Sequence, residues 1–476
     1  MLPTPVVAGI LIVLLLPMLW HLVKGDGLLT SAVLLAVLAL VTAFGFVVLR
    51  KLHHRKLAVV LALATVSGCV LLLVGTLGPS ATPPEPVRDA APAPPAAPIA
   101  GQLAEWFAPF GVETVSAPLV DFGRLRSGAA SGPLYAVSPT DAGALQQIVA
   151  LAYKRSVPLR IRGRGHSMNG SSLPRSNELL IRTRGLSHAR FEKPGTVTVE
   201  GGVPIHDLRK VLERYGYDIP VYNDGTADGG PSIGGYINAG GFGPGSAKFG
   251  GFWENVDAVT LVLADGTLRT LDRGDPDFAW IFGAMGQLGI VLEARLDIYP
   301  ATDTKAPSYP QGEALDVTEA LGRPPETVTD RPDATSRTPI YWFTLFVSPK
   351  DESAATRALA DIQQRHAGEL SFRPVYRYAI HHRAITAPLI YGVAEDFIAI
   401  GIWGDSPSPE AVEAIDAEVA TLARSTGYRR YMQAEIATGP NAYRDYFAPE
   451  TYQEFLRQRR RFDAKAGINN GSVFPE

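Results

Sequence analysis

The sequence predicts an α+β protein that follows three transmembrane helices, and three observations support this fold class. Three apolar stretches open the chain, strand-like runs then alternate with helical patterns, and a second strand and helix set comes later. These changes divide the chain into a membrane anchor at 1–78, a linker at 79–100, a first soluble domain at 101–303, an inserted domain at 304–445 and a carboxy-terminal segment at 446–476.

The three apolar stretches are Val6–Val23, Leu28–Leu49 and Leu57–Leu77, and each is close to the roughly 20 residues that cross a bilayer. The first stretch could instead be a signal peptide, but it lacks a basic segment before it and a small-residue cleavage site after it. Basic residues gather at 50–56, and the positive-inside rule places that loop in the cytoplasm. We therefore expect an integral membrane protein, embedded in the lipid bilayer, whose soluble domains are extracytoplasmic.

The composition excludes several classes of function. The net charge is −3, so the chain lacks the basic excess that nucleic acid binding requires. The only cysteine, Cys69, lies in the third apolar stretch, which excludes a disulfide within the chain and a cysteine-ligated metal in the soluble part. We find no sequence motif for a metal site. Redox chemistry in this protein would therefore need an organic cofactor.

The soluble part begins after a Pro/Ala-rich stretch, 79–98, that we expect to be an extended spacer. Alternating polar and apolar residues then predict strands at 159–165, 178–183, 196–202 and 258–271, with a hairpin turn at Asp265-Gly266. Helical patterns occupy Asp141–Arg155, Pro204–Tyr215 and Asp277–Phe282.

The inserted domain repeats one order of elements. Strands at 340–349 and 396–404 are each followed by a helix, at 351–368 and 409–427. This order predicts a sheet that is backed by helices. The last segment, Tyr446–Phe474, reads as a terminal helix and a short tail.

Two glycine-rich segments, Arg162–Ser172 and Pro231–Ser246, carry most of the functional information. Glycines at this density let backbone N–H groups converge on an anion such as a pyrophosphate, although each segment alone could simply form tight turns. Gly163 and Gly165 are next followed by Gly170, which does not satisfy the Rossmann fingerprint, and no P-loop sequence is present. A dinucleotide or nucleotide ligand is therefore indicated, held neither by a Rossmann fingerprint nor by a P-loop.

Four motifs then follow one another in a recognisable order: Gly163-Arg-Gly-His-Ser, Gly201-Gly-Val, Ser232-Ile-Gly-Gly and Gly286-Gln-Leu-Gly-Ile-Val. This order resembles the FAD-linked oxidoreductases of the vanillyl-alcohol oxidase, or PCMH-type FAD-binding, family. Cytokinin dehydrogenases and sugar-lactone or alditol oxidases are the branches it is most similar to. The resemblance covers about 119–300 and returns at Arg461–Phe474. It implies an FAD-binding domain of two subdomains, into which a substrate domain is inserted.

The resemblance also implies which residues contact FAD. His166 takes the position of the histidine that carries the flavin covalently through its 8α methyl, although a histidine satisfied by the backbone is the plainer alternative. Arg162 and Arg164 could likewise be solvated charges. The residues expected at the cofactor are Arg162, Gly163, Arg164, Gly165, His166, Ser167, Gly170, Ser232, Gly234, Gly235, Ala239, Gly240, Gly241, Gly289, Ile290 and Val291.

The implied activity is oxidation of a small organic molecule, an alcohol, sugar lactone or amine, by hydride transfer to flavin N5, with O₂ or a membrane quinone as the electron acceptor. Asp224 and Asp228 are the candidate catalytic bases, and each could instead cap a turn. A non-catalytic membrane protein that binds FAD as a sensor or scaffold is the alternative function. The side chains that could line a substrate pocket are Tyr376, Tyr378, His381, His382, Trp403 and Tyr431.

Overall fold

The computed structural model describes residues 100–115, 119–124, 133–223, 230–301, 309–322, 340–369, 371, 373–405, 408–433, 446–465 and 467–470. The predicted transmembrane helices lie outside these residues, as do Asp224 and Asp228. Of the helices that are described, none combines the length and the apolar character needed to cross a membrane.

The first sheet is mixed, in the order β1-β2-β4-β3. Its strands are β1 (Glu113–Val115), β2 (Leu134–Val137), β4 (Leu179–Arg182) and β3 (Leu159–Arg162), and the last three are parallel. Helix α5 (Ala142–Arg155) connects β2 to β3. It begins where the Asp141 carboxylate accepts the Ala144 N–H at 2.8 Å, an N-cap that satisfies a free donor of the first turn. The predicted helix at Asp141–Arg155 is thereby confirmed.

The second sheet is antiparallel, in the order β12-β5-β6-β10-β8-β9. Its strands are β12 (Ala314–Asp316), β5 (His188–Arg190), β6 (Thr196–Glu200), β10 (Ile290–Asp297), β8 (Val256–Val262) and β9 (Leu268–Asp272). β8 and β9 form the hairpin that was predicted at Asp265-Gly266. β12 pairs with β5, so residues 314–316 belong to this sheet, although the sequence placed them in the inserted domain.

Two hydrophobic cores fix these two sheets to each other and to the helices. One core joins the second sheet to α6 (Ile205–Arg214) and α7 (Ile233–Ala239). The other joins α5 and the first sheet to Val262, Ile290 and Leu292 on strands β8 and β10. The second sheet is therefore covered on both faces, which explains why its central strands are almost wholly buried.

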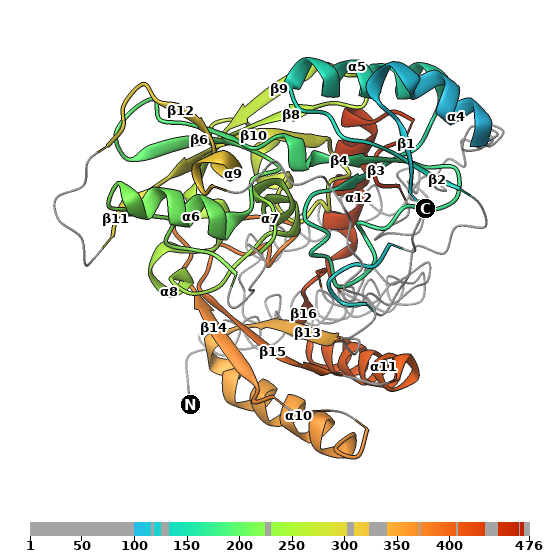
Figure 1. The fold of residues 1–476 in the computed structure, drawn as a ribbon. Helices are drawn as coiled ribbons and strands as arrows, with labels where there is room; N and C mark the ends of the chain where they lie inside the picture. The colour runs from blue at the N-terminus through green and yellow to red at the C-terminus, as the bar shows by residue number, and fades with distance from the viewer. Residues whose placement is uncertain are drawn as a thin grey trace, which may run out of the picture. The chain divides into compact units, whose positions relative to one another are not determined.

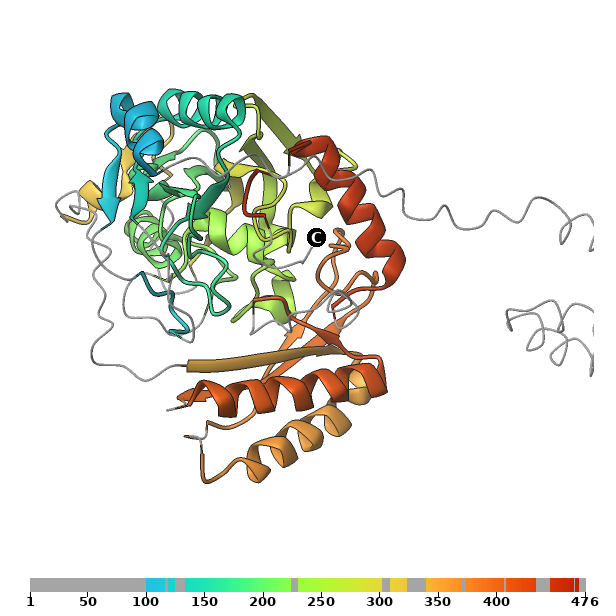
Figure 2. The same cartoon turned by 90° about the vertical axis from the view of Figure 1, so that its right-hand side faces the viewer.

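A third, antiparallel sheet has the order β14-β15-β13-β16. Its strands are β14 (Tyr376–Ile380), β15 (Phe397–Asp405), β13 (Ile340–Val347) and β16 (Arg429–Arg430). Helices α10 (Glu352–Arg365) and α11 (Pro409–Thr426) cover its outer face, as Figures 1 and 2 show. Tyr341, Phe343 and Leu345 point to these helices, so the alternate residues of β13 face the rest of the molecule. The predicted sheet with helices behind it is confirmed.

The chain then returns to the first sheet. Helix α12 (Pro449–Phe462) is followed by Ile468, which bridges Leu159 of β3 in parallel. The shorter elements are α4 (Ala100–Phe107), β7 (Tyr217–Asp218), α8 (Ser246–Phe249), β11 (Tyr299–Pro300), α9 (Val317–Ala320) and the 3₁₀ turns at Ala108–Phe110, Thr183–Gly185, Phe252–Asn255, Phe278–Trp280 and Pro349–Asp351.

Candidate active site

A cavity of ≈ 560 Å³ is enclosed by the loop after β3, by α7 with the turn before β10, and by the third sheet. Its volume lies within the range of about 300–1,000 Å³ that is usual for small-molecule and cofactor sites. One part of the wall is mostly glycine backbone and the opposite part is mostly aromatic.

The loop after β3 brings its backbone against the start of α7. Gly165 has φ +68°, and a Cβ on it would overlap the Arg162 guanidinium. A Cβ on Gly163 would overlap the hydroxyl of Ser232, the N-cap of α7. Both positions therefore require glycine, and the peptide groups of the loop form the cavity wall. The loop residues in that wall are Gly163, Arg164, Gly165, His166 and Ser167.

The Asp121 side chain holds this loop through hydrogen bonds. Its side chain is only 3% exposed and accepts hydrogen bonds from the Gly170 N–H at 2.7 Å, the Ser167 hydroxyl at 3.0 Å and the Arg124 N–H at 3.0 Å. Burial raises the pKa of Asp121 above its ordinary value, and the bond from Gly170 acts in the opposite direction. The Ser167 hydroxyl also lies 2.8 Å from that of Ser172. One buried carboxyl group thus determines the path of the loop from 167 to 172.

His166 lies in the wall with its ring held by neighbours. The imidazole stacks on Phe122, with ring centroids 4.2 Å apart and planes inclined by 24°. The backbone carbonyl oxygen of His166 accepts a hydrogen bond from Gln433 Nε2 at 3.3 Å. Phe122 and Gln433 line the cavity as well, so residues far apart in the sequence contact the ring and the backbone of His166.

The opposite side of the glycine wall is the first turn of α7. The Ser232 hydroxyl accepts the Gly235 N–H at 3.3 Å. A Cβ on Gly234 would come within 3.2 Å of Val291 and 3.0 Å of the Gly201 carbonyl, so the helix start lies directly against the ends of the central strands β6 and β10. The wall here is made by Gly201, Ser232, Gly234, Gly235, Asn238, Ala239, Gly286, Gly289, Ile290 and Val291.

The Asn469 side chain hydrogen-bonds to both sides of the glycine part of the wall. Its side chain, which is 5% exposed, accepts the Ile161 N–H at 2.9 Å and donates to the carbonyls of Met285 and Gly286 at 3.2 and 3.3 Å. Ile161 precedes the glycine loop, and Gly286 lies in the turn before β10. One side chain therefore links the strand that leads into the glycine loop to the turn before β10.

The aromatic part of the wall comes from the third sheet. Trp342 of β13 stands opposite Trp403 of β15 in the register, and Tyr376 and Tyr378 lie on the same face of β14. The Trp342 indole donates to the Tyr376 hydroxyl at 2.6 Å, and the Thr344 hydroxyl also contacts it. Burial raises the pKa of both Tyr376 and Tyr431 above that of a free phenol. These phenols therefore stay neutral at physiological pH.

Most of the residues that the sequence predicts for the cofactor lie together in this wall, with four exceptions. The Arg162 guanidinium donates to the Val120 carbonyl at 2.9 Å and the Ser172 hydroxyl at 3.2 Å, outside the wall. The Gly170 N–H is occupied by Asp121. A Cβ on Gly240 would overlap Ile390, and one on Gly241 would overlap the Tyr236 ring, so these two glycines serve packing at the end of α7.

Four of the predicted substrate-side residues, Tyr376, Tyr378, Trp403 and Tyr431, line the cavity. His381 and His382 do not. His381 pairs with the exposed carboxylate of Asp396 at 2.9 Å, and His382 contacts the Thr386 hydroxyl at 3.0 Å. Asp224 and Asp228 lie outside the described residues, so their role as bases stays a prediction.

Sequence reasoning missed several lining residues. Phe122, Trp342, Gln433 and Asn469 come from separate segments, and each looks like an ordinary core or loop residue in the sequence. The one available signal was the even spacing of Trp342 with Thr344 and Phe346 along β13, which puts them on the face away from the helices. No group of three or more metal-ligating side chains occurs within the described part of the chain.

The wall offers partners for the chemical groups of a flavin dinucleotide, which has a pyrophosphate at its centre and flat rings at its ends. Backbone groups at Gly163, Gly165 and Gly234, with the permanent charge of Arg164, suit a pyrophosphate. The apolar side chains of Val291 and the aromatic sheet suit flat ring systems. The residues present therefore fit FAD.

Comparison with known proteins agrees with this geometry. Residues 133–272 match the family model for the FAD binding domain. D-arabinono-1,4-lactone oxidase of Yarrowia lipolytica is 32% identical over 179 residues, which are 36% of this chain and 33% of that protein. L-gulonolactone oxidase of Mus musculus is 29% identical over 178 residues, 36% of this chain and 39% of that protein. Cytokinin dehydrogenase 6 of Oryza sativa is 26% identical over 201 residues, 40% of this chain and 37% of that protein.

The chain thus spans between 33% and 39% of the length of these curated relatives. The residues that match the family model include both glycine-rich segments and end before the third sheet begins at Ile340. Both the family match and the glycine-lined cavity identify residues 133–272 as an FAD-binding domain, with FAD as the cofactor.

Proposed function

We propose that the protein is an FAD-dependent oxidoreductase that oxidises a small, uncharged organic molecule, such as an alcohol, a sugar lactone or an amine in its neutral form. The observation that carries this proposal is a single cavity with the FAD-binding loops on one side and an aromatic wall on the other. A protein that only binds FAD would need the loops but not the aromatic wall. The names of the similar proteins, lactone oxidases and a cytokinin dehydrogenase, support the same class of reaction.

The chemistry of the wall supports an uncharged substrate. Among the described lining residues there is no aspartate, glutamate or lysine, and Arg164 is on the glycine side. Because burial raises the pKa of Tyr376 and Tyr431, the phenols offer neutral hydrogen-bonding groups to a substrate. Hydroxyl or ring N–H groups of a lactone or a purine are better partners for such a wall than a carboxylate is.

Each side of the cavity has a distinct task in this reaction. FAD, when bound, supplies the hydride acceptor. Gly163, Gly165, Ser232 and Gly234 would hold its pyrophosphate, while Trp342 and Trp403 would orient the substrate and exclude water from the reacting carbon. The proton that leaves the substrate needs a base, and Asp224 is the candidate that follows the lining residue Asn223 in the chain.

We further propose that His166 binds the flavin covalently. The imidazole lies in the cavity wall and its ring is held by Phe122, which fits a nucleophile that must stay oriented. Acid precipitation of the purified protein tests this, with absorbance and intact mass as readouts. A yellow wild-type pellet and a colourless His166→Ala pellet are expected. Flavin that is released from both would rule out the tether and leave the FAD site intact.

The activity itself is tested by flavin reduction without oxygen. The purified holoprotein is mixed with D-arabinono-1,4-lactone, L-gulono-1,4-lactone, a cytokinin or D-lactate, and loss of the visible flavin absorbance is followed. We expect reduction by an uncharged compound, and a slower rate in Trp403→Ala than in the control Trp106→Ala, since Trp106 contacts Arg155 and not the cavity. Flavin that no compound reduces would indicate a binding protein and contradict the proposal.

The electron acceptor is proposed to be O₂ or a membrane quinone. Admitting air, or adding a soluble quinone without air, to the reduced protein separates the two, because the faster route of reoxidation identifies the acceptor. The proposed membrane anchor would bring the site near the quinone pool.

A further inference from the structure

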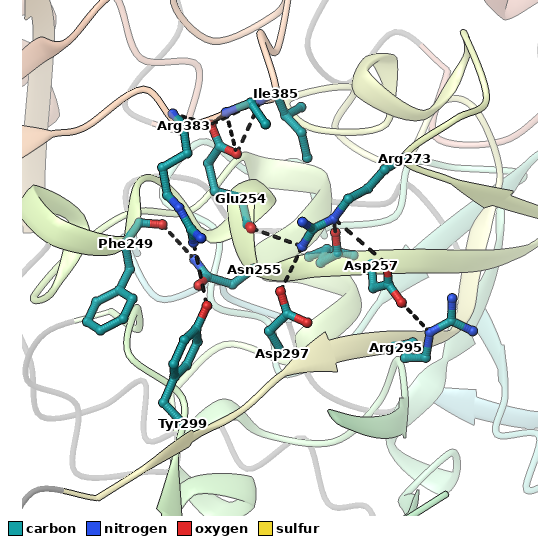
Figure 3. Close-up of polar contacts among 12 residues, drawn as sticks. Phe249, Glu254, Asn255, Asp257, Arg273, Arg295, Asp297, Tyr299, Arg383 and Ile385 are labelled. Atoms are coloured by element: carbon teal, nitrogen blue, oxygen red, sulfur yellow. Dashed lines mark hydrogen bonds and ion pairs between the residues drawn. The ribbon is translucent and has the colours of Figure 1, made fainter. Parts of the chain in front are cut away.

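Glu254 is a buried carboxylate that has no part in the cavity wall, and its partners are unusual. The residue lies in the 3₁₀ turn Phe252–Asn255 before β8 and is 1% exposed. Its oxygens accept backbone N–H groups from three successive residues: Arg383 at 2.9 Å, Ala384 at 3.0 Å and Ile385 at 3.1 Å. Figure 3 shows the carboxylate pointing at this turn, away from the ion pairs around Arg273.

The turn that Glu254 holds is the start of the connection from β14 to β15. It follows Ile380, the last residue of β14, and leads into Leu389 and Ile390. Just before the turn, the His381 N–H donates to the Ser246 carbonyl of α8 at 3.0 Å. We define residues 381–396 as the clamp, because they fasten the third sheet to the FAD-binding part of the molecule.

The clamp reaches the back of the glycine wall. Ile390 lies so close to Gly240 that a Cβ there would overlap it, and a Cβ on Gly283 would come within 2.9 Å of Ile390 and 3.0 Å of Leu389. Gly240 follows Ala239, and Gly283 precedes Met285, both of which line the cavity. The clamp is therefore linked to the cavity wall on one side and, through β14, to Tyr376 and Tyr378 on the other.

A carboxylate suits this position for a physical reason. A charged acceptor forms stronger hydrogen bonds to N–H groups than a neutral one, and leaving buried donors without a partner is costly. Ala384 and Ile385 each approach both oxygens, at 3.0 and 3.2 Å and at 3.1 and 3.2 Å. A glutamine has the same shape as the glutamate, but its NH₂ group would face some of these N–H donors. One of the two acceptor oxygens would therefore be lost.

We propose that Glu254 is a positioning residue that sets the third sheet, with its aromatic side chains, at the correct distance from the FAD loops. By holding the first turn of the clamp, it keeps Tyr376 and Tyr378 of β14 in the cavity wall. The kinetic part of this inference rests on the proposed oxidoreductase function, whereas the structural part does not.

Hydrogen exchange of the FAD-loaded protein, measured by mass spectrometry, tests the structural part. In Glu254→Gln we expect exchange at 376–385 to rise about tenfold, which is what the loss of one charge-assisted hydrogen bond corresponds to. Strand β6 should exchange as in the wild type. Asp257→Asn is the matched control, because Asp257 lies on β8 nearby but pairs with Arg295 at 2.6 Å, not with the clamp.

Three outcomes would overturn the proposal: no change in exchange, a change confined to 383–385 that leaves β14 protected, or an equal rise in β6 that marks general destabilisation. With the lactone or cytokinin that reduces the flavin best, Glu254→Gln should raise KM about tenfold at unchanged FAD content, and Asp257→Asn should not. An unchanged KM also contradicts it. If no compound reduces the flavin, the proposed function fails, and the exchange result still decides whether Glu254 holds β14.

Discussion

Asp121 is the residue whose loss should most directly loosen the FAD loop. Replacing it by alanine leaves the N–H groups of Gly170 and Arg124 and the Ser167 hydroxyl without their acceptor. A buried donor without a partner costs about 1–3 kcal/mol, so we expect a lower melting temperature. In the His166→Ala background, where the proposed tether is absent, we also expect faster loss of FAD. Thermal unfolding and flavin fluorescence in the filtrate measure the two effects.

Asp141→Ala is the control for this prediction. It removes the N-cap of α5, which costs about 1 kcal/mol of stability, but the cap does not touch the loop. If both variants lose FAD equally, the effect of Asp121 is global and its role at the loop is wrong.

At the scale of single elements, Gly401 of β15 makes room for Tyr376. A Cβ at this position would overlap the Tyr376 hydroxyl and the Phe343 carbonyl, so Gly401→Ala should push the phenol out of the cavity wall. Overpacking of this kind costs about 1–3 kcal/mol. We expect weaker substrate binding, seen as a higher KM in flavin reduction. Gly368→Ala, where nothing lies within 4 Å, should behave like the wild type.

Burial of Tyr431 in the aromatic part of the cavity wall also predicts how the free energy of unfolding depends on pH. Burial raises the pKa of Tyr431 in the folded state above its value of about 10 in the unfolded chain. The stability that the neutral, buried phenol contributes is therefore fully present below about pH 10, and it is lost as the pH rises from there through the folded pKa. The free energy of unfolding should therefore fall above about pH 10, and less steeply in Tyr431→Phe. Urea titrations across that pH range measure the slope. Equal slopes in both proteins would refute the assignment.

Elements with a strong local pattern could be predicted from the sequence, and the composition of the wall could not. Asp141 before an apolar helical repeat and Asp265-Gly266 between alternating strands mark their structures locally. The glycine segments were recognised because their spacing is imposed by a backbone that approaches a ligand closely. Asp121 and Glu254 gave no such signal, since each acts through backbone groups that become neighbours only in the folded chain.

For the whole molecule, the predicted anchor leads to a prediction about topology. An alkaline phosphatase fused at the carboxy terminus should be active, because this enzyme needs an extracytoplasmic location, whereas one fused after Leu52 in the basic loop should be inactive. A green fluorescent protein fused at the same two places should give the reverse pattern. An active phosphatase at Leu52 only would place the FAD-binding domain in the cytoplasm.

Asn469 also bears on when the protein can acquire its cofactor. The side chain bonds to Ile161, 308 positions earlier, and to the turn at Gly286. A nascent chain whose translation has reached only the third sheet carries Ile161 and the turn at Gly286 but lacks the side chain that joins them. The ribosome must pass residue 469 before the cavity is complete. We therefore expect FAD to be captured by the completed chain and not during its synthesis.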